Sequence, residues 1–294
     1  MPRSDLHAPV TDWYTRAARD LPWRRRGTTP WGVLVSEVML QQTPVARVVP
    51  VWQHWVQRWP EPADLAAAAP GDAVRAWDRL GYPRRALRLH GAAVAVVERH
   101  GGRVPGDHDL LLALPGVGGY TAAAVAAFAF GRRHPVVDTN VRRVQARAVR
   151  GEALPAPALT AAERRLAEQL LPDDPAGAAA WSVAVMELGA LVCTARGPRC
   201  GDCPVRDRCR WHLAGRPAAT TPVRRSQPWA GTDRMVRGRL LAVLRGADGP
   251  VAAAELAAAW DDDDQRGRCL ATLVADGLAE LRPDGTVALP GGAP

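Results

Sequence analysis

Between residues 8 and about 213 the sequence consists of short apolar and polar segments that proline and glycine separate, and none of them alternates like a β-strand. Val45, Val48 and Val49, for example, have the three- and four-residue spacing of an amphipathic helix. This pattern predicts an all-α region, because Pro and Gly mark helix ends here rather than hairpins. Helices are expected near 9–20, 30–42, 44–58, 71–80, 84–100, 107–113, 119–130, 139–149, 159–171 and 176–192.

The pattern changes after residue 214. Residues 215–233 are rich in Gly, Pro, Thr and Arg without periodicity, which predicts a linker. Helices are then expected near 234–245, 253–260 and 265–277. Two short strands, Leu278–Arg282 and Thr286–Leu289, follow around a Pro-Asp-Gly turn. Three helices and a hairpin predict a small winged-helix-like module (α+β) over 234–294.

The positive charge is unevenly distributed. Of the 38 basic residues, all arginine, residues 1–214 hold 28 against 20 acids, whereas residues 215–294 hold 10 of each. An excess of this kind suits a phosphate-backbone binder, although a solvated basic surface would look the same. Residues 240–294 carry 4 arginines against 9 acids, so their module is expected to pack or to contact protein rather than phosphate.

Five cysteines in a chain with no apolar signal region in residues 1–20 predict a metal site rather than disulfides. The longest apolar stretch, near 122–130, is too short to cross a bilayer, so a cytoplasmic protein without membrane contact is expected. Four of the cysteines have the spacing C-x6-C-x2-C-x5-C, which favours one [4Fe–4S] cluster over zinc, whose sites usually have two tight pairs. These four are Cys193, Cys200, Cys203 and Cys209, whereas Cys269 is expected to be a buried apolar residue.

Two acids stand out. Glu37 lies in an apolar helical segment and shares a face with Gln41, and a carboxylate in such surroundings should have a raised pKa that suits a general acid. A half-exposed surface glutamate is the alternative. Asp138 precedes a predicted helix, which it could simply cap. About 20 residues before it, Leu114-Pro-Gly-Val-Gly-Gly-Tyr-Thr121 has the form of a helix-hairpin-helix turn that grips phosphate, or of an ordinary helix–helix turn.

Several segments together resemble one family. In order they are Leu21–Arg24, Ser36-Glu-Val-Met-Leu-Gln-Gln-Thr43, Leu80–Tyr82, Leu114–Thr121, Val137–Val144, Met186-Glu-Leu-Gly-Ala190 and the four cysteines. Over residues 8–212 the chain resembles the MutY family of adenine DNA glycosylases, in the helix-hairpin-helix superfamily. The resemblance implies a two-lobed fold, with an iron–sulfur lobe (1–29 and 135–214) and a six-helix lobe (30–134), both within a 1–214 core.

The resemblance also implies an activity. The chain would be a monofunctional hydrolase of base excision repair that removes adenine mispaired with 8-oxoguanine or guanine in double-stranded DNA. It would act as a monomer at the nucleoid. Glu37 would protonate the flipped adenine and Asp138 would stabilise the sugar cation, with support from Tyr120 and Asn140. DNA contacts would come from Trp23, Arg24, Gln41, Gln42, Thr43, Tyr82, Gly116 and Gly118.

The sequence departs from the family at Thr139 and Pro83, where Gly and Tyr are usual, and the module at 234–294 replaces the Nudix-like domain of many members. One alternative is an endonuclease III-like glycosylase with lyase activity on damaged pyrimidines. That enzyme needs a lysine where this chain has Tyr120, and the chain contains no lysine. A non-catalytic iron–sulfur DNA-binding protein is the other alternative, and it would not need both Glu37 and Asp138.

Overall fold

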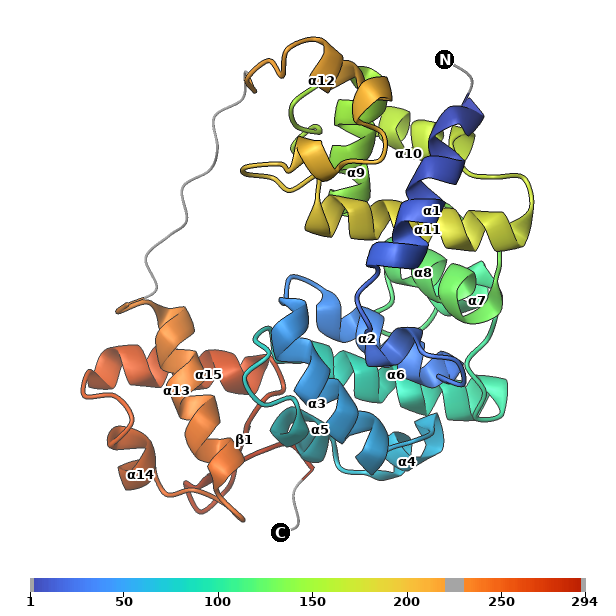
Figure 1. Ribbon diagram of the computed structural model, residues 1–294. Coiled ribbons are helices and arrows are strands. Elements are labelled where there is room, and N and C mark those ends of the chain that lie inside the picture. The colour runs from blue at the N-terminus through green and yellow to red at the C-terminus, as the bar shows by residue number, and fades with distance from the viewer. Residues whose placement is uncertain (1–2, 220–229, 292–294) are drawn as a thin grey trace. The chain divides into compact units, whose positions relative to one another are not determined.

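The computed structural model describes residues 3–219 and 230–291, so part of the predicted linker lies outside the described residues. The chain forms two units, both built mainly of helices (Figure 1). Unit 1 is Met1–Val33, Gly106–Ala113 and Val117–Val223; unit 2 is Leu34–Pro105, Leu114–Gly116 and Arg224–Pro294. The prediction placed residues 106–113 and 117–134 in the six-helix lobe, whereas the structure groups them with unit 1. The reason is that α7 (His108–Leu112) packs on α8 (Gly119–Phe130), and α8 packs on α11 (Pro175–Leu191).

Unit 1 is assembled around α11. This helix is apolar on nearly all sides and therefore becomes the buried centre, with Trp181, Val185 and Leu188 inside. Asp174 caps its start by accepting from the Gly177 amide at 2.6 Å. Against it pack α1 (His7–Ala17) and α9 (Thr139–Gln145), and α9 continues as a π-helical turn (Ala146–Arg150). In turn, α10 (Ala161–Gln169) packs on α9, and the short α12 (Arg210–Leu213) packs on the π-helical turn.

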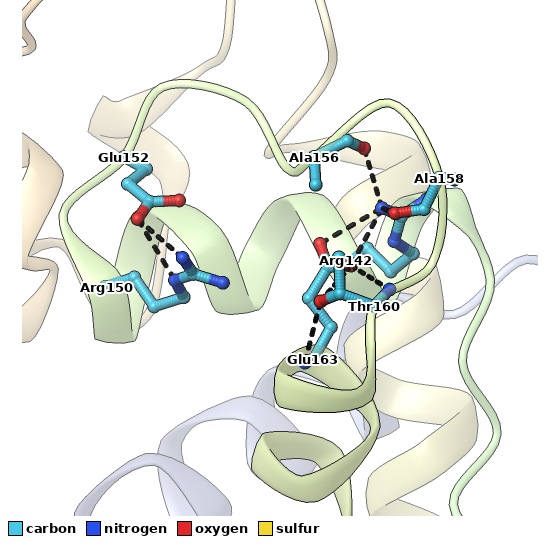
Figure 2. A network of polar contacts seen from close by, with 7 residues as sticks. All are labelled: Arg142, Arg150, Glu152, Ala156, Ala158, Thr160 and Glu163. Atoms are coloured by element: carbon cyan, nitrogen blue, oxygen red, sulfur yellow. Dashed lines mark hydrogen bonds and ion pairs between the residues drawn. The ribbon is translucent and has the colours of Figure 1, made fainter.

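A buried ion pair fixes α9 and α10 against the loop between them (Figure 2). Arg142 donates to both carboxylate oxygens of Glu163, at 3.0 and 2.9 Å, and to the carbonyls of Ala156 and Ala158 at 2.7 and 2.8 Å. Burial alone would raise the pKa of Glu163, but hydrogen bonds from Thr160 and Arg142 outweigh it and lower that pKa. The network holds α9, the helix that begins just after Asp138.

Unit 2 begins inside a helix, since α2 (Pro30–Leu40) passes from one unit to the other after Val33. It continues with α3 (Val45–Arg58), α4 (Pro62–Ala67), α5 (Pro70–Ala76) and α6 (Arg84–His100). Trp55 and Trp77 are fully buried in its core, with ring centroids 5.6 Å apart. Helix α4 was not predicted from the sequence, because prolines such as Pro62 are also typical of loops. Pro62 in fact occupies the first helical turn, where the missing amide costs nothing.

The C-terminal module is the predicted winged-helix-like unit and belongs to unit 2. Its helices are α13 (Asp233–Gly246), α14 (Ala253–Ala257) and α15 (Asp263–Ala275). The strands β1 (Glu280–Leu281) and β2 (Val287–Ala288) pair antiparallel, and Val251 forms a further bridge to Val287. No helix within the described residues is long and apolar enough to cross a membrane.

Candidate active site and iron–sulfur site

Asp138 is the N-cap of α9, as its position predicted, and both of its carboxylate oxygens are held. Oδ1 accepts from the Val141 amide at 2.7 Å, and Oδ2 accepts from the side-chain amide of Asn140 at 2.7 Å. Burial raises the pKa of Asp138 above its ordinary value, although these hydrogen bonds and the Arg143 charge act in the opposite direction. The site therefore holds a carboxylate in one orientation, in surroundings that make its negative charge costly.

Arg143 fixes the orientation of Asn140. Its guanidinium donates to Asn140 Oδ1 at 2.8 Å and to the Gly189 carbonyl at 2.7 Å, so the Asn140 amide nitrogen is directed to Asp138. Gly189 makes this approach possible, because a Cβ there would lie 2.7 Å from Asn140 Cβ. Arg143 Nε also donates to the Cys193 carbonyl at 2.6 Å. One chain of contacts thus joins Asp138 to the first cysteine of the quartet.

Glu37 lies on α2 and is only 4% exposed, with the fully buried Ser36 beside it. This burial excludes the alternative of a half-exposed surface glutamate. The raised pKa expected for Glu37 stays a prediction. Glu37 belongs to unit 2 and Asp138 to unit 1.

The residues after α2 form a rigid group. Arg85, on α6 and 6% exposed, donates to the carbonyls of Val38, Met39 and Gln41 at 2.9, 3.0 and 2.5 Å. Its other terminal nitrogen donates to Thr43 Oγ1 at 2.9 Å and to the Gly81 carbonyl at 3.1 Å.

The two loops that Arg85 joins each contain a non-glycine residue in the left-handed region, Gln42 at φ 56° and Tyr82 at φ 48°. Both side chains are exposed, Tyr82 to 44%. Gln41 and Thr43 are less accessible, and the structure brings these four predicted site residues together around Arg85. The role of Arg85 was not predicted from the sequence, since its four partners from Val38 to Thr43 lie more than 40 positions away along the chain.

Trp23 and Arg24 lie in a short 3-10 turn of unit 1 (Pro22–Arg24), with Trp23 buried. Arg24 donates to Glu187 at 3.1 Å, and Arg19 binds the same carboxylate through two contacts of 2.7 Å. Burial would raise the pKa of Glu187, but the Arg19 hydrogen bond, the Arg24 charge and the other Arg19 contacts lower it. No role was predicted for Glu187 from the sequence, although it too is an acid inside an apolar helix, the feature that singled out Glu37.

The predicted hairpin separates α7 from α8, as expected. Gly116 has φ +76°, and a Cβ there would lie 2.6 Å from Arg88 Cβ, so the turn requires glycine. Gly118 is the N-cap of α8 and is exposed, which leaves the first amides of that helix accessible to an anion. The Tyr120 hydroxyl donates to the sulfur of Met186 at 3.7 Å, across α8 and α11.

The four predicted cysteine ligands line one pocket in unit 1, together with Arg147 and Trp211. The pKa of the Cys203 thiol is raised to about 11, mainly by burial and further by the neighbouring cysteines. Thiolates in this pocket therefore need compensating positive charge. Four converging soft thiols fit an iron–sulfur cube, whose iron supplies that charge. The ligands are Cys193, Cys200, Cys203 and Cys209. Cys269 is buried elsewhere, in the C-terminal module.

Comparison with known proteins agrees with this geometry. Residues 35–169 match the family described as HhH-GPD superfamily base excision DNA repair protein, and residues 193–209 match the iron–sulfur binding domain of endonuclease III. The chain is 53% identical to the adenine DNA glycosylase of Mycobacterium tuberculosis over 291 residues, which covers 99% of this chain and 95% of that protein. It is 55% identical to the adenine DNA glycosylase of Mycolicibacterium smegmatis over 283 residues, covering 96% and 95%.

A solved structure of a thermostable thymine-DNA glycosylase matches with a TM-score of 0.65 and 27% identity, covering 72% of this chain and 97% of that one. The helical fold, the four pocket cysteines and the sequence identity over nearly the whole chain all indicate the same family. The chain belongs to the adenine DNA glycosylase family of helix-hairpin-helix base excision repair enzymes and holds one [4Fe–4S] cluster on its four pocket cysteines.

Proposed function

We propose that this protein hydrolyses the N-glycosidic bond of adenine that is mispaired with 8-oxoguanine or guanine in double-stranded DNA. The observation that carries the proposal is a pair of carboxylates in two different environments: Glu37, buried in an apolar helix, and Asp138, held by two hydrogen bonds. Different surroundings can shift the pKa values of two carboxyl groups apart, so that one donates a proton while the other remains charged. The family membership supports adenine as the base.

In the proposed reaction Glu37 protonates N7 of the extruded adenine, which makes the base a better leaving group. The bond between N9 and C1′ then breaks, and its electron pair leaves with the base. Asp138 stabilises the positive charge that develops on the sugar. A water molecule adds to C1′ and gives a proton to the Glu37 carboxylate, which restores the acid, so the products are free adenine and an abasic sugar. Asn140 keeps the Asp138 carboxylate oriented, and Tyr120 supports the same region.

Extrusion of the base requires a wedge and a grip on the backbone. Gln42 and Tyr82, both exposed and both fixed by the Arg85 group, are proposed to enter the base stack beside the opposite guanine. Trp23 and Arg24 line the adenine pocket, Gln41 and Thr43 hold the segment before the wedge, and Gly116 and Gly118 place the hairpin amides near phosphate. The cluster supplies a rigid support for residues 193–209, whose exposed arginines are Arg196, Arg199, Arg206 and Arg208.

The absence of lysine from the 294 residues argues for hydrolysis alone. A glycosylase with β-lyase activity attacks the sugar with an amine, and a guanidinium remains protonated and cannot do so. We therefore propose a monofunctional enzyme that works as a monomer on the DNA of the nucleoid.

The proposal is tested with labelled duplexes that contain A:8-oxoguanine, A:G, A:C or T:G, and one with an oxidised pyrimidine. We expect cleavage of the adenine strand opposite 8-oxoguanine and guanine only after alkali treatment, with release of free adenine. Cleavage without alkali would point to a lyase. Excision of thymine or of the oxidised pyrimidine in preference to adenine would refute the proposed substrate.

A further inference from the structure

The C-terminal module is joined to α5 by a reciprocal exchange of arginines. Arg245 Nε, on α13, donates to the Val74 carbonyl at 2.9 Å, while Arg75 donates to the carbonyls of Arg245 and of Ala247, the latter at 2.7 Å. The Gly71 amide donates to the Pro290 carbonyl at 2.7 Å, beyond β2. Arg245 is half-buried at this junction, and burial lowers its pKa to about 10. Figure 1 shows the module's strands beside α5.

The junction continues to the start of α6. Arg84 pairs with Asp276 of the module at 3.2 Å, and Arg237 on α13 pairs with the same carboxylate at 2.6 Å. These contacts bring the first turns of α13 to the loop that carries Tyr82. There the Arg234 guanidinium lies 4.8 Å from the centre of the Tyr82 ring, and the Arg85 guanidinium lies 5.4 Å from it.

The charge of the module is not uniform. The excess of acids over arginines, which argued against contact with phosphate, is confined to residues 240–294. The first part of α13 instead carries Arg234, Arg237 and Arg239, and Arg234 is exposed. The part of the module nearest to Tyr82 is therefore its basic end.

Tyr82 needs such support. Its backbone is in a left-handed conformation that tyrosine rarely adopts, and its ring is 44% exposed, so packing holds it only on part of its surface. Arg85 is committed to five backbone and side-chain acceptors and cannot follow the ring. A guanidinium over the ring gives it one preferred orientation at an exposed site.

We propose that the C-terminal module takes part in mispair recognition through Arg234, a positioning residue that holds the Tyr82 ring ready to enter the base stack opposite the adenine. This inference rests on the proposed function. It assigns to the module a task in recognising the opposite strand, and it makes docking of the module on α5 a condition for that task.

The test measures unstacking separately from chemistry. In a Glu37→Gln background, which binds without excising, a 2-aminopurine placed next to 8-oxoguanine on its strand reports entry of the wedge by a rise in fluorescence. Arg234→Ala is compared with Arg234→Lys. The matched control is Arg239→Ala, which removes from the same helix, α13, a cation that lies over the ring of Trp260.

We expect Arg234→Ala to diminish the fluorescence rise and to raise the Kd about two- to five-fold, the size of an exposed cation–π contact. In a Glu37-containing enzyme its single-turnover rate at saturation should stay within about two-fold of wild type. Arg234→Lys should recover most of the signal, and Arg239→Ala should retain it. Gly71→Ala, whose Cβ would lie 2.6 Å from the Pro290 carbonyl oxygen, should reproduce the Arg234→Ala result by loosening the dock.

A fluorescence rise in Arg234→Ala equal to that of the wild type would overturn the inference. If, in addition, the slope of log Kd against log salt concentration fell by about one, Arg234 would be a phosphate contact alone. A wild-type enzyme that leaves adenine in place would refute the proposed function. Normal wild-type excision with an unaffected Arg234→Ala variant would refute only the role of Arg234.

Discussion

Gly189→Ala should damage both stability and activity, because the new methyl group has no room. The added Cβ would lie 2.7 Å from Asn140 Cβ and 2.8 Å from the Asn140 carbonyl oxygen, and neither atom is at the free end of a flexible side chain. Overpacking of this kind costs about 1–3 kcal/mol. Replacing a mid-helix glycine by alanine returns about 1 kcal/mol. The expected net loss is up to about 2 kcal/mol, or up to roughly 4–8 °C in Tm.

The activity should fall further than the stability. Displacement of Asn140 moves the amide that holds Asp138, and a shift of about 1 Å at a reacting group can cost on the order of 100-fold in rate. Circular dichroism melting and single-turnover adenine release measure the two effects. The matched control is Gly238→Ala, also within a helix but with no atom within 4 Å of the added Cβ, which should be slightly stabilising and fully active. A Gly189→Ala enzyme with wild-type Tm and rate would refute the reasoning.

Three further changes have defined outcomes. Arg142→Ala should lower the free energy of unfolding by about 3–5 kcal/mol in urea titrations, because it leaves Glu163 buried without its cation. The control Arg150→Ala, which breaks an exposed ion pair with Glu152, should cost less than about 1 kcal/mol. Equal losses in the two variants would contradict this expectation. Asp138→Asn should be inactive, because an amide carries no charge and has one acceptor oxygen for the two donors at this position. Because the pKa of Asp138 is raised in the folded state, the stability of the wild type relative to Asp138→Asn should increase as the pH falls through the raised pKa towards the ordinary one; a difference in unfolding free energy that does not change with pH would contradict this. Cys203→Ser should reduce iron content and visible absorption while Cys269→Ser leaves both intact, and a colourless zinc-loaded wild type would rule out the cluster.

The helical framework could be predicted because its signals are local. Apolar spacing defined α3 and α6, and the cap at Asp138 and the glycines of the hairpin marked where α9 and α8 begin. The cysteine ligands were predictable for the same reason, since all four lie within 17 positions. The miss at α4 came from prolines that serve as helix starts as well as loop residues.

The supports of the site could not be predicted, because they join distant segments. Arg85 reaches carbonyls 44 to 47 positions earlier, and Arg143 reaches Gly189 and Cys193 across 46 and 50 positions. Nothing in their local sequence distinguishes these arginines from the many that face solvent. Arg234 is similar, because its contact with Tyr82 depends on how the C-terminal module docks on α5.

The most direct test of the account is single-turnover release of adenine from an A:8-oxoguanine duplex by the wild-type enzyme and by Glu37→Gln. The amide keeps the size of the side chain at this buried position but cannot donate a proton to N7. The account predicts unchanged duplex affinity and melting temperature, with a rate at least about 100-fold lower. A Glu37→Gln enzyme that releases adenine at the wild-type rate would contradict it.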